Sequence, residues 1–191
     1  MSPATHRLKK LAQDVGDATS HAPPSSLEEV RKVIAEFEQL VTKSTLSDPW
    51  NRHLMINRLS SDWQIFWVRE GLPAEMVTLI AKDLGWDLVT LLKKTGISRS
   101  TVNRKEQRKK PLSSQESERI IGISKLIDTV RSMVSGSEEA ENFDAEKWVG
   151  NWLKVPMPAL GNKAPADYMD TSIGQSRVLN LLKQIQSGSY A

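Results

Sequence analysis

The chain of 191 residues contains no cysteine, which excludes disulfide bonds and thiolate metal sites and favours a reducing compartment. Its three histidines, His6, His21 and His53, lack the spacing of metal ligands, so no metal site is expected. No apolar stretch approaches the ~20 residues of a membrane-spanning helix, and residues 1–15 hold no apolar run of a secretory signal. We therefore expect a soluble, cytoplasmic protein.

The usual sequence features of enzymes are also missing. The chain has no cysteine nucleophile, no glycine-rich phosphate loop and no clustered pair of carboxylates. These absences predict a protein that is not an enzyme and that carries no cofactor. No stretch has the alternation of a β-strand and no internal repeat is visible, so the expected fold class is all-α.

The first 70 residues are expected to form an extension. Residues 1–25 are poor in apolar side chains and are predicted to be disordered or weakly structured. Residues 26–70 are predicted to be helical, beginning at a capping box over Ser26–Glu29. Apolar residues then recur at steps of three and four on one helix stripe: Leu27, Val30, Ile34, Phe37 and Val41. The stripe suits either a coiled-coil dimer seam or a helix docked on its own domain. Docking is favoured because fewer than three heptads are present.

Helices within residues 71–136 are marked by their caps and breakers. Caps and apolar spacing predict helices over residues 73–84, 87–95, 99–108 and 114–134. Gly96 permits a tight turn between the second and third helices, because glycine tolerates positive φ. Ile97 is predicted to be buried in that turn, Ser98 to cap the third helix, and Ser113–Glu116 to form a capping box for the fourth. This spacing is typical of a helix-turn-helix.

Positive charge is concentrated on that motif. Residues 93–110 carry eight basic side chains and one acidic one, a segment charge of +7, whereas the rest of the chain carries −4 of the net +3. Such a distribution indicates a polyanion-binding surface, with a solvated loop as the alternative. The second helix of such a motif lies in the major groove, so the residues predicted to face base edges are Arg99, Ser100, Thr101, Asn103 and Arg104. The residues expected to meet phosphates are Ser98, Lys105, Arg108, Lys109 and Lys110. Val102 is expected to point into the core.

Residues 137–191 are predicted to form a second helical domain, after a linker at Ser135-Gly136-Ser137. Asp144 is expected to cap one helix and Thr171 to cap the last, over residues 172–186. The residues of the last helix predicted to face inward are Ile173, Val178, Leu181, Leu182 and Ile185. The six tryptophans are expected to be core anchors, in preference to a cofactor or nucleobase platform.

Two groups of motifs follow one another along the sequence. The first comprises Gly96–Val102, Leu112-Ser113 and Glu116–Arg119. The second comprises Trp152-Leu153, Pro158–Gly161, Pro165, Asp170-Thr171, Gly174, Arg177, Val178, Ile185, Gly188 and Tyr190. From residue 65 to residue 191 the chain resembles the Xre/MbcA/ParS-type antitoxins that are paired with RES-domain toxins. Asn162 stands where such proteins often carry a second glycine, and we expect it to adopt left-handed backbone.

The resemblance implies a function for both segments. RES toxins of this kind deplete NAD, and their antitoxins bind them through the C-terminal domain while the helix-turn-helix represses the operon's promoter. The resemblance implies that the toxin is neutralised by Leu160, Gly161, Arg177, Lys183, Gly188, Ser189, Tyr190 and Ala191, the last four lying over the NAD pocket. A cation and an aromatic ring suit a pocket built for phosphates and rings. The expected partners are a RES-domain toxin, operator DNA and a second copy of the chain, since palindromic sites require a dimer.

One other function uses the same basic segment. A stand-alone helix-turn-helix regulator without a toxin partner has the same DNA-facing residues, and differs only in having no use for the C-terminal motifs. Without the resemblance, Arg177 is best explained as a surface salt bridge and Tyr190 as part of a frayed terminus. The C-terminal domain therefore decides between the two functions.

Overall fold

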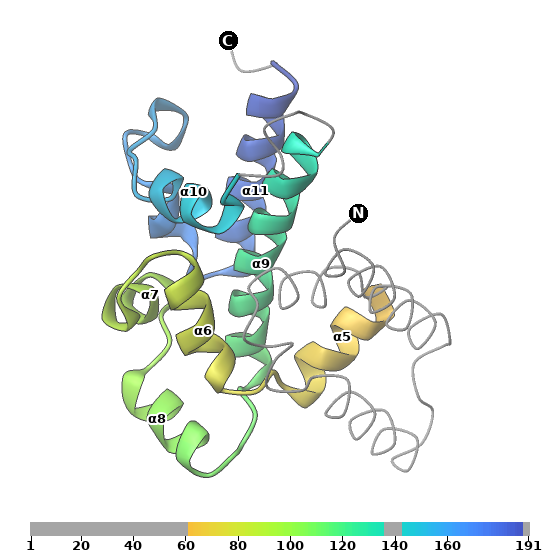
Figure 1. The fold of residues 1–191 in the computed structure, drawn as a ribbon, viewed down its shortest axis with the longest axis vertical. Coiled ribbons are helices and arrows are strands. Elements are labelled where there is room, and N and C mark those ends of the chain that lie inside the picture. Colours follow the sequence, from red (N-terminus) through yellow and green to blue (C-terminus); the bar gives the residue numbers. More distant parts are fainter. Residues whose placement is uncertain (1–60, 136–142, 189–191) are drawn as a thin grey trace. The chain divides into compact units, whose positions relative to one another are not determined.

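The computed structural model describes residues 61–135 and 143–188 of the chain (Figure 1). The predictions for residues 1–60, for Gly136 and Ser137, and for Ser189–Ala191 lie outside the described residues. The chain divides into two compact units, Met1–Trp67 and Val68–Ala191. Helix α5 (Ser61–Glu70) spans the boundary between the units. All of the predicted site residues belong to the second unit.

The described elements are all helical, which confirms the predicted fold class. In chain order after α5 they are α6 (Glu75–Asp83), α7 (Leu88–Thr95), α8 (Arg99–Gln107), α9 (Ser114–Val134), α10 (Ala145–Trp152), the 3₁₀ helices η2 (Pro158–Leu160) and η3 (Pro165–Tyr168), and α11 (Ser172–Gln186). In the described part of the chain, β-structure is limited to isolated bridges between Pro73 and Pro111 and between Met157 and Lys163. None of the described helices is long and apolar enough to cross a membrane.

Three predicted caps, Ser113, Asp144 and Thr171, begin their helices as expected, and Asp87, predicted only as the first residue of its helix, caps α7. Asp87, Ser113, Asp144 and Thr171 each accept a hydrogen bond from an amide in the first turn of the helix that follows. At Ser113 the capping box is complete, because the N3 glutamate also bonds the backbone of the cap. Gly96 ends α7 with φ 63°, the left-handed conformation that glycine adopts without steric cost.

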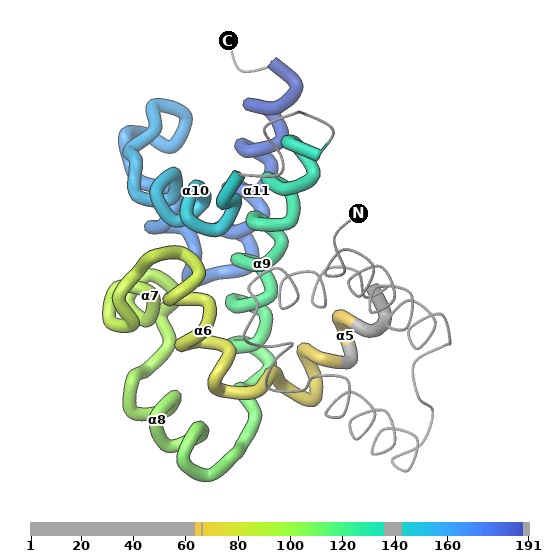
Figure 2. Tube along the Cα trace, viewed as in Figure 1, coloured from red at the N-terminus to blue at the C-terminus, as the bar shows by residue number. Residues whose placement is uncertain are grey.

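Helix α9 is the common support of the second unit. It packs against α6 as well as α10 and α11, an arrangement that can be followed along the tube in Figure 2. Its buried apolar residues are Ile120, Ile121, Ile123, Leu126, Ile127 and Val130. A helix that is apolar over so much of its circumference is one that neighbours cover on several sides.

The segments on either side of Gly136 share one core. The indole Nε1 of Trp86, which follows α6, donates a buried hydrogen bond of 2.8 Å to the carbonyl of Gly150 on α10. Lys94 Nζ on α7 lies 2.5 Å from Oδ1 of Asp167 in η3, and this hydrogen bond holds the pKa of the Asp167 carboxyl below its usual value. The predicted domain boundary near residue 136 therefore separates two segments of the sequence, but these segments pack together in one core.

Two predictions of inward-facing side chains on α11 are wrong. Val178, Leu181 and Leu182 are buried, but Ile173 is 83% exposed and Ile185 is 38% exposed. Ile173 precedes Leu182 by nine residues, which at 100° per residue places the two side chains on opposite sides of the helix. In Figure 2 the last turn of α11, which carries Ile185, extends past the end of α9.

The prediction that the six tryptophans are core anchors is right for two and wrong for one, while Trp152 is half-buried and the side chains of Trp50 and Trp63 lie outside the described residues. Trp67 and Trp86 are buried, whereas Trp148 is 39% exposed. Helix α10 fills its buried face with smaller residues, including Val149 and Gly150, so Trp148 lies beside that face. Its ring stacks instead on Trp152, with 6.1 Å between ring centroids.

Candidate functional site

Helix α8 presents five of its nine residues to solvent. Only Val102 is buried among its nine residues, which confirms the predicted inward position of that valine. The exposed residues of α8 and the turn after it are Arg99, Ser100, Asn103, Arg104, Gln107, Arg108, Lys109 and Lys110, while Thr101 is half-buried. Ile97, in the turn before the helix, is buried as predicted. The geometry is therefore that of a short helix with one buried side chain, whose exposed residues are free to contact a partner.

The cap of α8 differs from the prediction. Ser98 occupies the N-cap position with extended backbone, but its hydroxyl makes no capping hydrogen bond. The Ser98 Oγ lies 2.9 Å from the Ser100 Oγ instead. The two hydroxyls therefore satisfy each other beside the free amides of the first turn, where an incoming phosphate oxygen finds unused donors.

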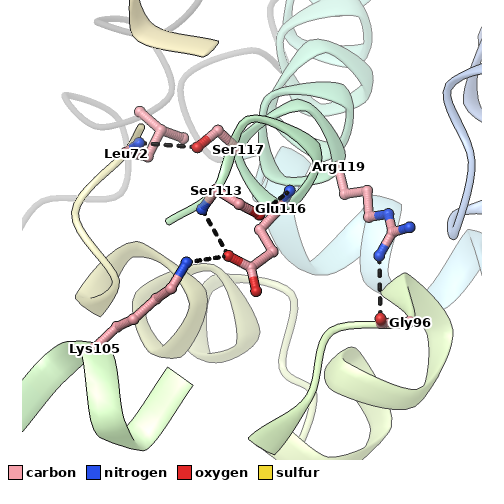
Figure 3. Close-up of polar contacts among 7 residues, drawn as sticks. All are labelled: Leu72, Gly96, Lys105, Ser113, Glu116, Ser117 and Arg119. Carbon is pink, nitrogen blue, oxygen red and sulfur yellow. Dashed lines mark hydrogen bonds and ion pairs between the residues drawn. The ribbon is translucent and has the colours of Figure 1, made fainter. Parts of the chain in front are cut away.

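Lys105 is held by the protein itself. Its Nζ lies 2.6 Å from Oε2 of Glu116 on α9, and the two side chains are only 17% and 13% exposed. Burial raises the pKa of the Glu116 carboxyl, but the hydrogen bonds from Lys105 and from the Ser113 amide outweigh burial and hold that pKa below its usual value. The Glu116 carboxyl is therefore ionised at neutral pH, and Lys105 is turned toward α9 (Figure 3).

The end of α8 contains backbone strain at a basic residue. Lys109 has φ 49°, a left-handed conformation that costs a non-glycine residue about 1–2 kcal/mol. The Lys109 amide donates to the carbonyl of Glu106 and the Lys110 amide to the carbonyl of Lys105, at 3.1 and 2.9 Å. These two bonds form the Schellman motif that glycine ordinarily completes. Glycine would be more stable at this position, so the presence of a lysine there indicates that the side chain serves a function.

Replacing Lys109 by glycine should raise the free energy of unfolding by about 1 kcal/mol, because glycine adopts the left-handed conformation without strain. Thermal or urea unfolding measures this gain. Lys110→Gly is the matched control, since it removes the same charge from the next residue, where φ is not positive. An equal or larger gain for Lys110→Gly would contradict the explanation from backbone strain.

The loop between α10 and α11 arranges the second group of predicted residues. Gly161 and Asn162 both adopt left-handed backbone, with φ 64° and 60°, which confirms the expectation for Asn162. The Leu160 side chain is only 3% exposed, so it anchors the loop in the core and offers little apolar surface to a partner. Gly161 is exposed at the tip of the loop.

Tyr168 connects this loop with α11, and the sequence did not single it out. Its hydroxyl donates to the carbonyl of Leu160 at 3.1 Å. The Arg177 guanidinium lies over the Tyr168 ring, 5.4 Å from the centroid, a cation–π contact. The structure therefore joins Leu160 and Arg177 through one aromatic side chain and leaves the guanidinium exposed. Tyr168 lay in a loop without periodicity, so only its contacts reveal it.

The remaining predicted residues of this group are exposed where they are described. Lys183 on α11 and Gly188, which ends the helix with φ 66°, both face solvent. Ser189, Tyr190 and Ala191 lie outside the described residues. Among the residues that the structure describes, no group of three or more histidine or acidic side chains is placed to hold a metal ion.

These features define a class of protein: a helix-turn-helix protein with a second helical domain packed onto the same core. Comparison with protein families shows the same two parts. Residues 68–124 match the Antitoxin Xre-like helix-turn-helix domain, and residues 140–188 match the Antitoxin Xre/MbcA/ParS C-terminal toxin-binding domain.

Two curated relatives agree with the family matches. The chain is 37% identical over 124 residues to a Prs ADP-ribosylating antitoxin of Sphingobium sp. (strain YBL2), covering 65% of this chain and 78% of the relative. It is 27% identical over 124 residues to an Antitoxin Xre of Photorhabdus laumondii subsp. laumondii, covering 63% and 76%. The chain belongs to the Xre/MbcA/ParS antitoxin family. It is an antitoxin with a helix-turn-helix domain and a toxin-binding domain.

Proposed function

We propose that this antitoxin neutralises a RES-domain toxin that consumes NAD, and that it represses its own promoter through α8. The observation that carries the proposal is the exposed basic surface of α8, which shares a compact unit with the toxin-binding domain. The name of the Sphingobium relative associates that protein with ADP-ribosylation, a reaction whose ADP-ribosyl donor is NAD. That chemistry supports a partner that uses NAD.

In the proposed complex with DNA, α8 lies in the major groove. Arg99, Ser100, Thr101, Asn103 and Arg104 face the base edges, where arginine pairs with guanine and asparagine with adenine. The phosphate contacts are made by Ser98, Arg108, Lys109 and Lys110. Lys105 is left out of this set because it pairs with Glu116. Two copies of the chain bind a two-fold symmetric operator.

In the proposed complex with the toxin, the loop tip at Gly161 and the exposed cations Arg177 and Lys183 contact the rim of the NAD pocket. Residues 188–191 occupy the pocket itself. The Tyr168 ring holds the Arg177 guanidinium in place, so less side-chain entropy is lost when a phosphate-binding site receives it. Co-expression with a RES-domain toxin tests this partnership: the antitoxin should restore growth and co-purify with the toxin.

Operator binding should fall steeply with salt, because each phosphate contact releases counterions from the DNA. Lys110→Ala should weaken binding to specific and to non-specific DNA about equally and reduce the slope of log K against log [salt] by about 1.

Arg99→Ala should instead relax discrimination at one base pair, a loss of roughly 1–3 kcal/mol for the preferred base. Fluorescence anisotropy with the promoter fragment measures the salt slope and the discrimination between bases. The salt concentration should run from about 50 to about 300 mM, which brackets physiological salt. An affinity that does not depend on salt would contradict the proposed contacts.

A further inference from the structure

The start of α9 reaches the helix-turn-helix at two separate points. Glu116 Oε2 accepts a hydrogen bond from Lys105 Nζ on α8 at 2.6 Å. One turn further along, Arg119 Nη1 donates to the carbonyl of Gly96, the turn residue before α8, at 3.0 Å. Figure 3 shows the two side chains leaving the same helix, Glu116 toward Lys105 on α8 and Arg119 toward the turn at Gly96.

A third side chain between them bonds a different segment. Ser117 is fully buried, and its hydroxyl accepts a hydrogen bond of 2.9 Å from the amide of Leu72, which precedes α6. The Leu72 carbonyl in turn accepts from the amide of Leu112, just before α9. Glu116, Ser117 and Arg119 thus bond three different parts of the helix-turn-helix domain, and we call them the α9 clamp.

Within the part of the chain that the structure describes, helix α8 packs on α6 and has few other attachments to the core. It is nine residues long, buries only Val102 and receives no side-chain cap from Ser98. Among residues 61–135 and 143–188, its other side-chain bond to a neighbouring helix runs from the Thr78 hydroxyl to Glu106, at 3.0 Å on the exposed surface. Short helices are marginally stable without tertiary contacts, so what holds α8 also determines its orientation.

We propose that the α9 clamp fixes the orientation of α8 for operator binding, with Glu116 and Arg119 as positioning residues that do not touch DNA. The inference rests on the proposed function, since it concerns the same DNA-binding helix. The proposal gives Lys105 a role different from that of the exposed lysines. Lys105 attaches α8 to α9 and so fixes its orientation, whereas Lys110 neutralises a phosphate.

One substitution distinguishes the clamp from electrostatics alone, because the two predict changes in operator affinity of opposite sign. Removing an acid near a DNA-binding surface strengthens binding when only charge matters, because repulsion of the phosphates falls. Glu116→Gln removes that charge and retains the capping box, which glutamine also supports. The clamp predicts that Glu116→Gln weakens operator binding, because α8 loses its charge-assisted bond to α9. Glu118→Gln is the matched control, since Glu118 is exposed two residues further along the same helix.

The experiment compares the two variants with the wild-type full chain on the promoter fragment. Glu116→Gln should bind the operator roughly five-fold more weakly, with an unchanged salt slope, whereas Glu118→Gln should bind equally or more tightly. Lys105→Met should have the same effect as Glu116→Gln, and the double variant should be no worse than either, because both remove one contact. Tighter operator binding by Glu116→Gln, or additive losses in the double variant, overturns the clamp.

Hydrogen exchange of the α8 amides in the free protein tests the clamp without DNA. Glu116→Gln should accelerate exchange throughout α8, and Glu118→Gln should leave it unchanged. Should the wild-type protein fail to bind its promoter, the proposed repression fails, while the exchange rates still decide the clamp. Equal α8 exchange in the wild type and in Glu116→Gln overturns it.

Discussion

Replacing Gly150 by alanine should cost this protein about 3 kcal/mol or more of its free energy of unfolding, the upper part of the range for overpacked cores. A Cβ atom on Gly150 would lie 2.0 Å from the carbonyl oxygen of Leu84, a backbone atom that cannot rotate away. Helix α10 would have to withdraw from α6 and stretch the Trp86–Gly150 hydrogen bond. Thermal unfolding should show a midpoint lower by roughly 10 °C, and the fluorescence of the buried Trp86 should shift to the red.

Gly85→Ala provides the control for that substitution. Gly85 lies between Leu84 and Trp86 at the same junction, with φ 63°, and a Cβ atom added there would have no neighbouring atom within 4 Å. Alanine at this position therefore meets backbone strain but no clash, and its cost should stay near the roughly 1–2 kcal/mol of left-handed backbone. If Gly150→Ala were no less stable than Gly85→Ala, the close approach of α10 to α6 would not be what joins the two segments.

The local structure of the second unit could be predicted because short-range interactions determine it. Asp87 and Ser113 are followed within three residues by the amides they cap, and Gly96 needs no distant partner to adopt positive φ. The bounds of α9 and α11 follow from such caps together with apolar spacing. Val102 was assignable to the core because it is the one apolar residue in a basic helix.

The candidate site was less predictable, because its contacts join residues far apart in the chain. Lys105 carries the same charge as Lys110, and only the position of Glu116 on another helix distinguishes them. Likewise, periodicity cannot say which neighbour covers a given face. Ile173 fits an apolar pattern yet lies on the outer side of α11, while the small Gly150 allows α10 to approach the backbone of Leu84 closely.

Gln175 links the DNA-binding and toxin-binding segments within the shared core. Its Nε2 donates to the carbonyl of Arg119 at 2.9 Å and to that of Met169 at 3.0 Å. The side chain lies against Gly122, where a Cβ would approach its Oε1 to 1.9 Å. A residue of the toxin-binding domain thus bonds the helix that carries the α9 clamp. This bond is one of the contacts that join the two segments in one compact unit.

Deleting residues 188–191 should abolish protection against the toxin and leave operator binding unchanged. Tyr190 and its neighbours are proposed to fill the NAD pocket, and truncating a central aromatic anchor of an interface costs about 2 kcal/mol or more, some 30-fold in affinity. Helix α8 and the α9 clamp are untouched, because α11 ends at Gln186, before the deletion. Growth under co-expressed toxin measures protection, and anisotropy on the promoter fragment measures operator affinity. Asn180→Ala, an exposed polar change on α11, should alter neither. Undiminished protection by the truncated chain would show that the toxin is neutralised elsewhere on the domain.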